Sequence, residues 1–483
     1  MPRTAAELQI LPISAAKVIC NGTSRHDPSR RGGGLIEVPK VLHLAYHFPP
    51  IGGGGVQRNL EFARRLPDHG YEVIVVTGSG DAGGRWTPRD PTLLEAVPPS
   101  VAVERVSEPT PVPGRSFRRR VDKLLMRPTR FSEDWTTSVL AASERLAPDI
   151  DLIYASLVPY EAAEAAGRLA THLGIPWVAD LQDPWALDEM CLYPTGLHRR
   201  ADLRRMSRLL SSAAAIVLNT PEAVIRLRDA LPELAGNTVV SIPNGFDPDL
   251  FEGPPPRRDD ERERFRVVHT GYLHTELGLE TRKNGRLRRL AGGMFLPIDI
   301  LTRSHVYLMQ ALEELERTEP SLRALIDVHF AGVLSETDRR SLEGVSGVKL
   351  HGYLAHRDSV SLVRTADLLF LPMHNLPEGT RAGLVPGKTY EYVRSGRPIL
   401  AAIPRGDAFD LLERLPNAHL VAPDDVAGMT AALKRRVDTW LKTGSPSTPV
   451  EDVYDEFSHS HLVGRLASLF DTVVAKSQAA VVS

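Results

Sequence analysis

The feature that most constrains the fold of this chain is a repeated alternation of short apolar runs with segments of helical periodicity. Residues 41–46 form an apolar run, residues 52–55 form a glycine loop, helical spacing follows from Val56 to Leu66, and residues 72–76 form a second apolar run. Such strand–loop–helix–strand units predict an α/β fold with a mostly parallel sheet and helices on both faces. Further strands are expected at 151–156, 176–180 and 214–218, and further helices at 159–173, 198–212 and 221–231.

The alternation is broken once, near residues 242–248, and a run of three prolines at 254–256 follows. A second alternating series starts at Phe265, with strands expected near 326–331, 348–351, 367–371, 398–402 and 419–422. We therefore predict two Rossmann-like domains facing a central cleft, because open α/β sheets bind ligands at the carboxyl ends of their strands. The predicted parts are a flexible tail over 1–38, a first domain over 39–245, a second domain over 246–458, and over 459–483 a helix that packs back on the first domain, with a tail.

Composition narrows the class of protein. A chain of 483 residues with 42% hydrophobic and 24% charged residues is typical of a soluble globular protein with two domains. The net charge of −2 gives no general attraction to nucleic acid. Cys20 and Cys191 lie far apart, which argues against a disulfide framework and favours the cytoplasm. We see neither a secretory signal nor the ~20 uninterrupted apolar residues that a membrane span needs.

The glycine loop at 52–55 joins a strand to a helix, as phosphate-binding loops do. Glycines let a ligand approach the backbone closely, and the N-terminus of a helix offers N–H groups and partial positive charge. We expect Gly53, Gly54, Gly55 and Arg58 to hold a diphosphate, or a molecule that accepts a transferred group and lies near a diphosphate. The spacing matches neither the dinucleotide fingerprint nor the P-loop. The alternative is a tight turn without a ligand.

Acidic residues follow the strand expected at 176–180. Asp183 lies at its carboxyl end, where it could bind sugar or acceptor hydroxyls, or its side chain could bond local amides in a turn. Asp-x-Asp patterns, which can hold a metal on a nucleotide diphosphate, occur at 149–151 and 247–249. The first opens a strand and the second lies in the linker, so we expect no metal site at either.

Residues 381–399 predict a loop, a helix that begins after Pro386, and a strand. The N-terminal amides of that helix would point towards the cleft, ready for phosphate oxygens. Glu391, about one turn into the helix, could accept hydrogen bonds from the two hydroxyls of a ribose. It could equally be an acid that stabilises the helix dipole, and composition does not decide between these roles.

Together these segments resemble the family 4 retaining glycosyltransferases, which have the GT-B fold. The resemblance covers about residues 40 to 475 and rests on residues 46–50 with the glycines, 70–73, 180–185, 242–247, 366–372 and 386–398. It implies that Glu391 holds the ribose and that the amides of Leu384 and Val385 contact the diphosphate. The donor-binding residues expected from it are Gly271, Gly383, Leu384, Val385, Pro386, Lys388 and Glu391.

Two elements of the family pattern differ in this chain. The first glutamate of the family's pair falls at Gly383, so its role at the donor sugar is unfilled. The family's arginine–lysine pair does not align cleanly, and Arg303, Lys283 and Arg282 are candidates for it. Arg303 is preferred because it directly precedes a helix expected at 304–315. We predict Arg303, Lys283 and Asp183 as the catalytic group, with solvated surface cations as the alternative for the basic residues.

The resemblance implies transfer of a sugar from a nucleotide-sugar co-substrate, with retention, in cell-surface polysaccharide or glycolipid assembly. The expected acceptor is a glycan, a lipid-linked molecule or a small molecule. Helix N-termini and a cation would stabilise the departing nucleoside diphosphate without a metal or another cofactor. Two alternatives stay open: a nucleotide-sugar epimerase or hydrolase on a similar scaffold, and a catalytically inactive binding partner, which Gly383 and the displaced basic pair keep open.

Two further segments carry clustered cations. Residues 114–127 combine them with apolar residues at helical spacing, which favours docking on an anionic membrane surface, on the inner face of the membrane. A solvated basic helix is the alternative. Residues 272–302 form a long, irregular, basic connection, which predicts a mobile lid that orders when donor or acceptor binds. A surface decoration is the alternative.

Overall fold

The computed structural model describes residues 38–81, 87–106, 130–146, 150–258, 264–444 and 452–482. The predicted tail up to residue 37, the basic segment at 114–127 and Asp149 lie outside the described residues. None of the helices in the described part of the chain is long and apolar enough to cross a bilayer.

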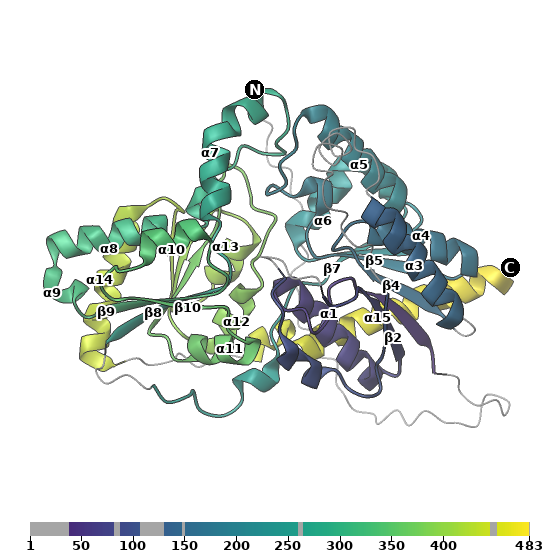
Figure 1. Ribbon diagram of the computed structural model, residues 1–483, viewed down its shortest axis with the longest axis horizontal. Coiled ribbons are helices and arrows are strands. Elements are labelled where there is room, and N and C mark those ends of the chain that lie inside the picture. Colours follow the sequence, from purple (N-terminus) through teal and green to yellow (C-terminus); the bar gives the residue numbers. More distant parts are fainter. Residues whose placement is uncertain are drawn as a thin grey trace. The chain divides into compact units, whose positions relative to one another are not determined.

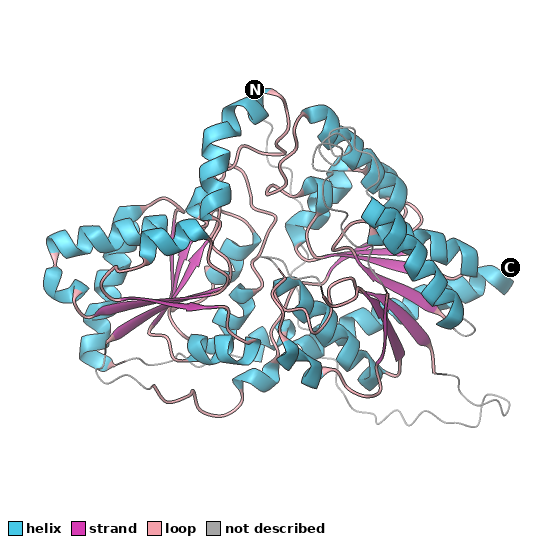
Figure 2. Ribbon diagram, viewed as in Figure 1, coloured by secondary structure: helices cyan, strands magenta, loops and turns pink. Residues whose placement is uncertain are grey.

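A seven-stranded parallel sheet forms the centre of the first domain, in the order β3-β2-β1-β4-β5-β6-β7 (Figure 2). Its strands are β1 (Lys40–Leu44), β2 (Glu72–Thr77), β3 (Ala102–Arg105), β4 (Leu152–Ser156), β5 (Trp177–Leu181), β6 (Ala215–Leu218) and β7 (Thr238–Ser241). The strand order reverses between β1 and β4, and this is the switch point at which doubly wound sheets bind ligands.

Helices cover both faces of this sheet. The helices are α1 (Gly54–Arg65), α3 (Arg130–Leu146), α4 (Ala162–Leu173), α5 (Gly196–Leu210), α6 (Pro221–Ala230) and the C-terminal α15 (His459–Val482). Successive residues of a strand face opposite sides, so Leu42 joins the core under α3 to α6, and Val41 joins the core under α1 and α15. Figure 1 shows α15, in yellow, beside α1. The first domain is therefore completed by the last helix of the chain.

The second domain has a six-stranded parallel sheet in the order β10-β9-β8-β11-β12-β13. Its strands are β8 (Phe265–Thr270), β9 (Ile326–Ala331), β10 (Val348–Gly352), β11 (Leu368–Pro372), β12 (Ile399–Ala402) and β13 (Ala418–Val421). Its helices are α7 (Thr275–Leu290), α8 (Val306–Thr318), α9 (Pro320–Arg323), α10 (Glu336–Leu342), α11 (His356–Arg364), α12 (Lys388–Ser395), α13 (Asp407–Leu412) and α14 (Val426–Thr443). Helices α8 and α14 pack on one face, and α11, α12 and α13 pack on the other.

The connection at 272–302 is more regular than the sequence suggested. It contains the 16-residue helix α7 and a short 3-10 turn at Ile300–Thr302. Arginine, lysine, leucine and glutamate are good helix formers, but the many charges hid the apolar periodicity that reveals a packed helix. The expectation of an irregular stretch is therefore corrected, whereas the prediction of a lid stays a prediction.

Candidate active site

A cavity of about 470 Å³ lies at the carboxyl ends of the strands, with walls from both domains. The first domain contributes the glycine loop, Arg58 and Asp183, and the second contributes Arg303 and the start of α12. Of the predicted site residues, those that line the cavity are Gly53, Gly54, Gly55, Arg58, Asp183, Gly271, Arg303, Pro386, Lys388 and Glu391. A single cavity thus brings together predicted residues that are up to 338 positions apart, from Gly53 to Glu391.

The glycine loop brings the two domains close together. A side chain at Gly52 would collide with the hydroxyl group of Tyr353, which follows β10 in the second domain. The same hydroxyl donates a hydrogen bond of 2.9 Å to Asp90 of the first domain. Part of the glycine run therefore serves close packing between domains, and its binding of a phosphate or an acceptor remains a prediction.

Arg58 is held by its own domain. Its guanidinium, 2% exposed, donates to both carboxylate oxygens of Asp180 at 2.7 and 2.9 Å and to the carbonyl oxygen of Pro243 at 2.8 Å. Tyr154 donates to the same carboxylate. The N–H groups of Arg58 that a phosphate would need are therefore already bonded to Asp180. The observed contacts of Arg58 fix the linker at Pro243 to the sheet.

Two cations meet at the second-domain wall of the cavity. Arg303 follows the 3-10 turn at Ile300–Thr302, and Lys388 is the first residue of α12. Burial and the nearby charge of Arg303 lower the pKa of Lys388 to about 7, although Glu391 opposes this shift. Burial also lowers the pKa of Arg303, and Asp183 opposes that shift. A pair of cations whose charged forms are disfavoured by burial favours an anionic ligand.

Gly271 makes the position of Lys388 possible. A Cβ atom at residue 271, whose φ is 97°, would lie 2.8 Å from the lysine nitrogen. The same nitrogen lies 3.3 Å from Nε2 of His269. The end of β8 thus supplies the room that the lysine side chain needs to reach the cavity.

Glu391 has a partner that the sequence did not reveal. Oε1 of Glu391 lies 2.7 Å from Nε2 of His356, the first residue of α11, and both side chains are mostly buried at 16% and 18% exposure. Burial alone would lower the pKa of His356, but the hydrogen bond and charge of Glu391 raise it. A lone histidine at a helix start carries no pattern that identifies it, and only the packing of α11 against α12 brings the two side chains together.

Asp183 is half-buried at the cavity, near Arg303 and the buried acids Asp188 and Glu189. Burial raises its pKa, with Arg303 opposing, and burial together with Asp183 and Glu189 raises the pKa of Asp188 to about 8. A sharp turn positions these acids: Trp185 has a φ of 52°, and its N–H donates to the carbonyl oxygen of Asp183 at 2.8 Å. Backbone strain of this kind is concentrated at functional sites.

The remaining predicted residues lie elsewhere. Lys283 is exposed on α7, and the cavity lining does not include it. Gly383, Leu384 and Val385 are buried outside the lining. The N–H group of Gly383 donates to Glu189 at 3.0 Å, and a Cβ atom at residue 383 would lie 2.8 Å from the guanidinium carbon of Arg226. In this chain, first-domain side chains surround the position at which the family pattern has its first glutamate.

The described residues contain no group of three or more histidines, cysteines, aspartates or glutamates arranged to hold a metal ion. In the second Asp-x-Asp pattern, Asp247 and Asp249 form ion pairs with Arg64 and Arg65. Asp151 accepts a hydrogen bond of 2.8 Å from the backbone N–H of Lys40. These acids have structural partners.

Comparisons with known proteins bear on the first domain and on the fold. Residues 53–245 match the family model described as glycosyl transferase 4-like domain. No curated protein sequence matches the chain significantly.

Among solved structures, HepE of Anabaena in complex with UDP and glucose has a TM-score of 0.56 and 17% identity over 90% of this chain and 100% of HepE. Sucrose-phosphate synthase of Thermosynechococcus elongatus has a TM-score of 0.60 and 13% identity over 91% of this chain and all of its own. The UDP-forming trehalose-phosphate synthase of Burkholderia vietnamiensis has a TM-score of 0.54 and 14% identity over 91% and 100%. The predicted α/β GT-B fold and the resemblance to glycosyltransferases of this type are confirmed.

Proposed function

We propose that this chain, whose first domain matches the glycosyl transferase 4-like model and whose fold is GT-B, transfers a sugar from a nucleotide-sugar donor to an acceptor. The observation that supports this most directly is the placement of Arg303 and Lys388 on one wall of the cavity. Burial makes the charges of both Arg303 and Lys388 costly, repulsion by Arg303 adds to the cost at Lys388, and a diphosphate would relieve that cost. These cations would then stabilise the charge that develops on the departing nucleoside diphosphate.

The donor would be oriented by Glu391. Its Oε1 accepts from His356, and its second oxygen is the one we assign to a ribose hydroxyl. Charge-assisted hydrogen bonds of this kind are roughly twice as strong as neutral ones. HepE of Anabaena has been solved with UDP and with UDP-glucose, which makes UDP-sugars the first donors to test.

The acceptor would enter from the first-domain wall, between the glycine loop and Asp183. We propose that the acceptor oxygen attacks the anomeric carbon on the face from which the diphosphate leaves. The carbon–oxygen bond to the diphosphate breaks, the new glycosidic bond forms, and the acceptor proton passes to the departing phosphate oxygen. The product would then keep the donor's anomeric configuration, and Asp183 would orient the acceptor hydroxyl.

We further propose that this transfer needs no metal or other cofactor, since Arg303 and Lys388 supply positive charge where a metal would act. The proposed setting is polysaccharide or glycolipid assembly, with a glycan, a lipid-linked molecule or a small molecule as acceptor. The clustered cations of residues 114–127 would hold the protein at an anionic membrane surface on the cytoplasmic side.

Calorimetry with a panel of nucleotide sugars tests donor binding, and a nucleotide-release assay with and without candidate acceptors tests the reaction. We expect one or a few donors to bind, release that depends on an acceptor, unchanged turnover in EDTA, and a product whose anomeric configuration by NMR matches that of the donor. Equal release without any acceptor would favour a hydrolase. The absence of binding across the whole panel would favour an inactive partner protein.

A further inference from the structure

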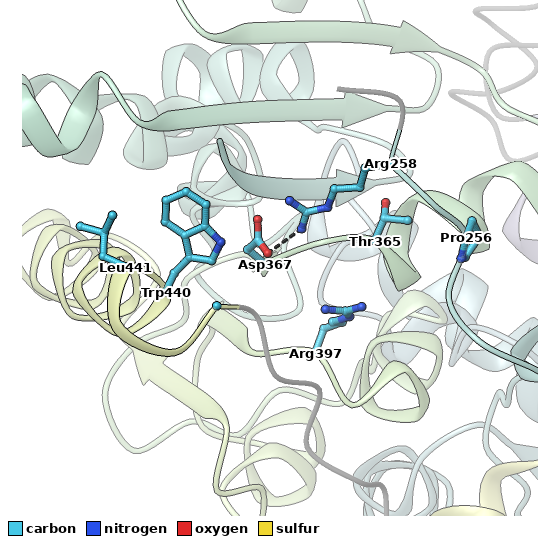
Figure 3. A pocket seen from close by; sticks show the side chains of 8 residues that line it. Pro256, Arg258, Thr365, Asp367, Arg397, Trp440 and Leu441 are labelled. Atoms are coloured by element: carbon cyan, nitrogen blue, oxygen red, sulfur yellow. Dashed lines mark hydrogen bonds and ion pairs between the residues drawn. The ribbon is translucent and has the colours of Figure 1, made fainter. Parts of the chain in front are cut away.

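A second cavity, of about 410 Å³, lies at the amino ends of the strands of the second-domain sheet (Figure 3). Thr365 and Asp367, which line it, precede the amino end of β11, whereas the proposed donor site lies at the carboxyl ends of the strands. A strand rises about 3.3 Å per residue, so the five steps from Arg266 to Gly271, along β8 and its end, separate the two regions by roughly 16 Å. The second cavity is therefore a separate feature of the domain.

Among the described residues that line this cavity, cations outnumber acids. Asp367, whose side chain is fully buried, accepts from Arg258 at 2.5 Å through one oxygen and from the backbone N–H of Arg266 at 2.8 Å through the other. Arg397, 8% exposed, also lines the cavity, and Figure 3 shows its guanidinium near that of Arg258 and Asp367. In the described lining of the cavity, one carboxylate thus stands with two guanidinium groups.

Neighbouring charges increase this excess. Burial lowers the pKa of Arg397, the charges of Arg258 and Arg364 lower it further, and Asp367 offsets the shift only in part. Burial also lowers the pKa of Arg436, which interacts with the same carboxylate. Positive charge concentrated in a cavity raises its affinity for anions.

The cavity presents Arg397 from a fixed backbone. The N–H group of Arg397 donates to Ser395 at 3.2 Å, and its carbonyl oxygen accepts from Asn417 at 3.1 Å. The opposite wall is apolar: the ring of Trp440 packs edge-on against Phe265 at 5.9 Å. A paired cationic wall and an aromatic wall suit a molecule that has an anionic group at one end and an apolar or planar part at the other.

We propose that this cavity binds a phosphate-bearing small molecule, with the phosphate between Arg258 and Arg397 and the rest of the molecule against Trp440. Guanidinium groups recognise phosphate because their N–H groups form a fixed fork that pairs with two oxygens. A volume of about 410 Å³ falls within the range of small-molecule sites. The proposal does not depend on the reaction in the cleft.

Titration with inorganic pyrophosphate tests the proposal. The cleft is also expected to bind pyrophosphate, so the full-length chain carries Arg303→Met and Lys388→Met as the background. Trp440 is the one tryptophan between residues 246 and 458, so its fluorescence reports the second cavity. We expect a saturable change of this fluorescence, its loss in Trp440→Phe, and binding by calorimetry in both proteins.

Arg397→Gln in the same background should weaken pyrophosphate binding by about tenfold or more, because it removes charge-assisted hydrogen bonds to the phosphate. The matched control is Arg340→Gln on α10, which is exposed and should leave the affinity unchanged. If Arg397→Gln fails to fold, Arg397→Lys keeps the charge but loses the fork, and it should bind pyrophosphate several-fold more weakly.

Binding by the background variant that Arg397→Gln or Arg397→Lys leaves unaltered would overturn the proposal, as would no binding at all. Vesicles of phosphatidate and phosphatidylcholine identify the source of the phosphate. Binding of pyrophosphate without vesicle binding supports a soluble ligand. Binding of vesicles alone would overturn a small-molecule site and point to a lipid headgroup.

Discussion

Lys388 is the residue that links donor binding to pH. Its pKa in the free protein is about 7, below the ordinary 10.5, because the side chain is buried beside Arg303. Above pH 7 the lysine is mostly neutral, whereas a bound diphosphate favours the ammonium form. Binding should therefore take up a proton, and nucleotide affinity should fall by up to about tenfold per pH unit above pH 7. Calorimetry in buffers of different ionisation enthalpy measures both effects.

Lys388→Met is the matching variant. It should bind nucleotide more weakly at pH 7 and lose the decline in affinity between pH 7 and 9. The stability of the free protein changes in the opposite direction. Between pH 7 and 10.5 the unfolded chain binds more protons at this lysine than the folded chain, so this residue makes stability rise with pH in that window. The same pH slope of affinity in both proteins would show that Lys388 does not meet the diphosphate.

Glu391→Gln tests ribose binding. The substitution keeps the shape of the side chain but removes the charge from its hydrogen bonds, including the one of 2.7 Å with His356. Donor affinity should fall about tenfold, since charge-assisted bonds contribute roughly 1.5–3 kcal/mol and ~1.4 kcal/mol is a factor of ten. His356→Gln is the control for the pair: it keeps the carboxylate and should weaken donor binding less. A normal donor affinity in Glu391→Gln, together with a lower melting temperature, would make Glu391 a structural residue.

The sequence directed attention to Glu391 and Lys388 because both follow Pro386 on a helix whose start is marked by local pattern, in the segment that resembles the family's donor site; both line the cavity, and their binding of a donor stays a prediction. The sequence could not find His356, whose partner lies 35 positions away. It also could not show that Asp180 occupies the guanidinium of Arg58, or that Gly383 faces Arg226 of the other domain. These contacts join residues that are far apart in the sequence, and the spacing of residues along the chain does not reveal such packing.

At the scale of elements, α6 is tied to the loop before α12 by a buried polar network. Arg226 of α6 forms an ion pair with Glu189, which has no exposed side-chain surface, and donates to the carbonyl oxygen of Arg381. Burial favours the neutral form of Glu189, but hydrogen bonds from His374 and Arg226 outweigh it and lower its pKa. Glu189 also accepts from the N–H group of Gly383. The network therefore joins both domains next to the proposed donor site.

Arg226→Leu should destabilise the protein by about 3–5 kcal/mol, because it leaves the charge of Glu189 buried without its cation. Chemical denaturation measures this loss. Arg228→Leu, an exposed position on the same helix, controls for the substitution itself and should leave the unfolding midpoint unchanged. Equal midpoints for the two variants would mean that Glu189 is not stabilised by Arg226.

The segment at 272–302 is the element most suited to report domain closure. The turn after α7 pairs with the first domain. The N–H group of Tyr193 donates to the carbonyl oxygen of Gly293 at 2.8 Å, and that of Gly196 donates to the carbonyl oxygen of Ala291 at 2.7 Å. We predict that donor and acceptor together slow hydrogen exchange across 272–302, and that exchange in the buried strand β9 stays constant. Unchanged protection in every complex would argue for a surface decoration.

The two strands of the first sheet that sequence missed share one property. Strands β3 and β7 lie at the two edges of their sheet, and β3 is largely exposed, so neither carries a long apolar run. The central strands β1, β4 and β5 are buried on both faces and were predicted within one or two residues of their observed bounds. Burial on both faces made the central strands of the first sheet predictable and left its edges undefined, whereas the edge strands β10 and β13 of the second sheet were predicted near 348–351 and 419–422.

At the scale of the whole molecule, the chain passes between the domains twice, and the two crossings lie side by side. The N–H group of Phe246 donates to Phe457 at 3.1 Å, and that of His459 donates to Phe246 at 2.9 Å. Domain movement in a two-domain enzyme is absorbed by a few such residues. The pairing of the crossings therefore favours a single hinge between the domains, and it returns the chain to the first domain for α15.

Truncation tests whether that return is required. Ending the chain after Ser458 removes buried α15 side chains that pack on the first sheet, among them Leu462, Val463, Leu466, Phe470 and Val473. Each buried side chain of this size contributes about 1.5–3 kcal/mol, so five together approach the ~5–15 kcal/mol by which a folded domain is stable. We expect the truncated chain to aggregate or to lose its cooperative unfolding. Ending the chain after Lys476 removes the end of α15 beyond these side chains and should leave the melting temperature unchanged. A soluble, cooperatively folding chain that ends at Ser458 would show that the first domain is complete without its last helix.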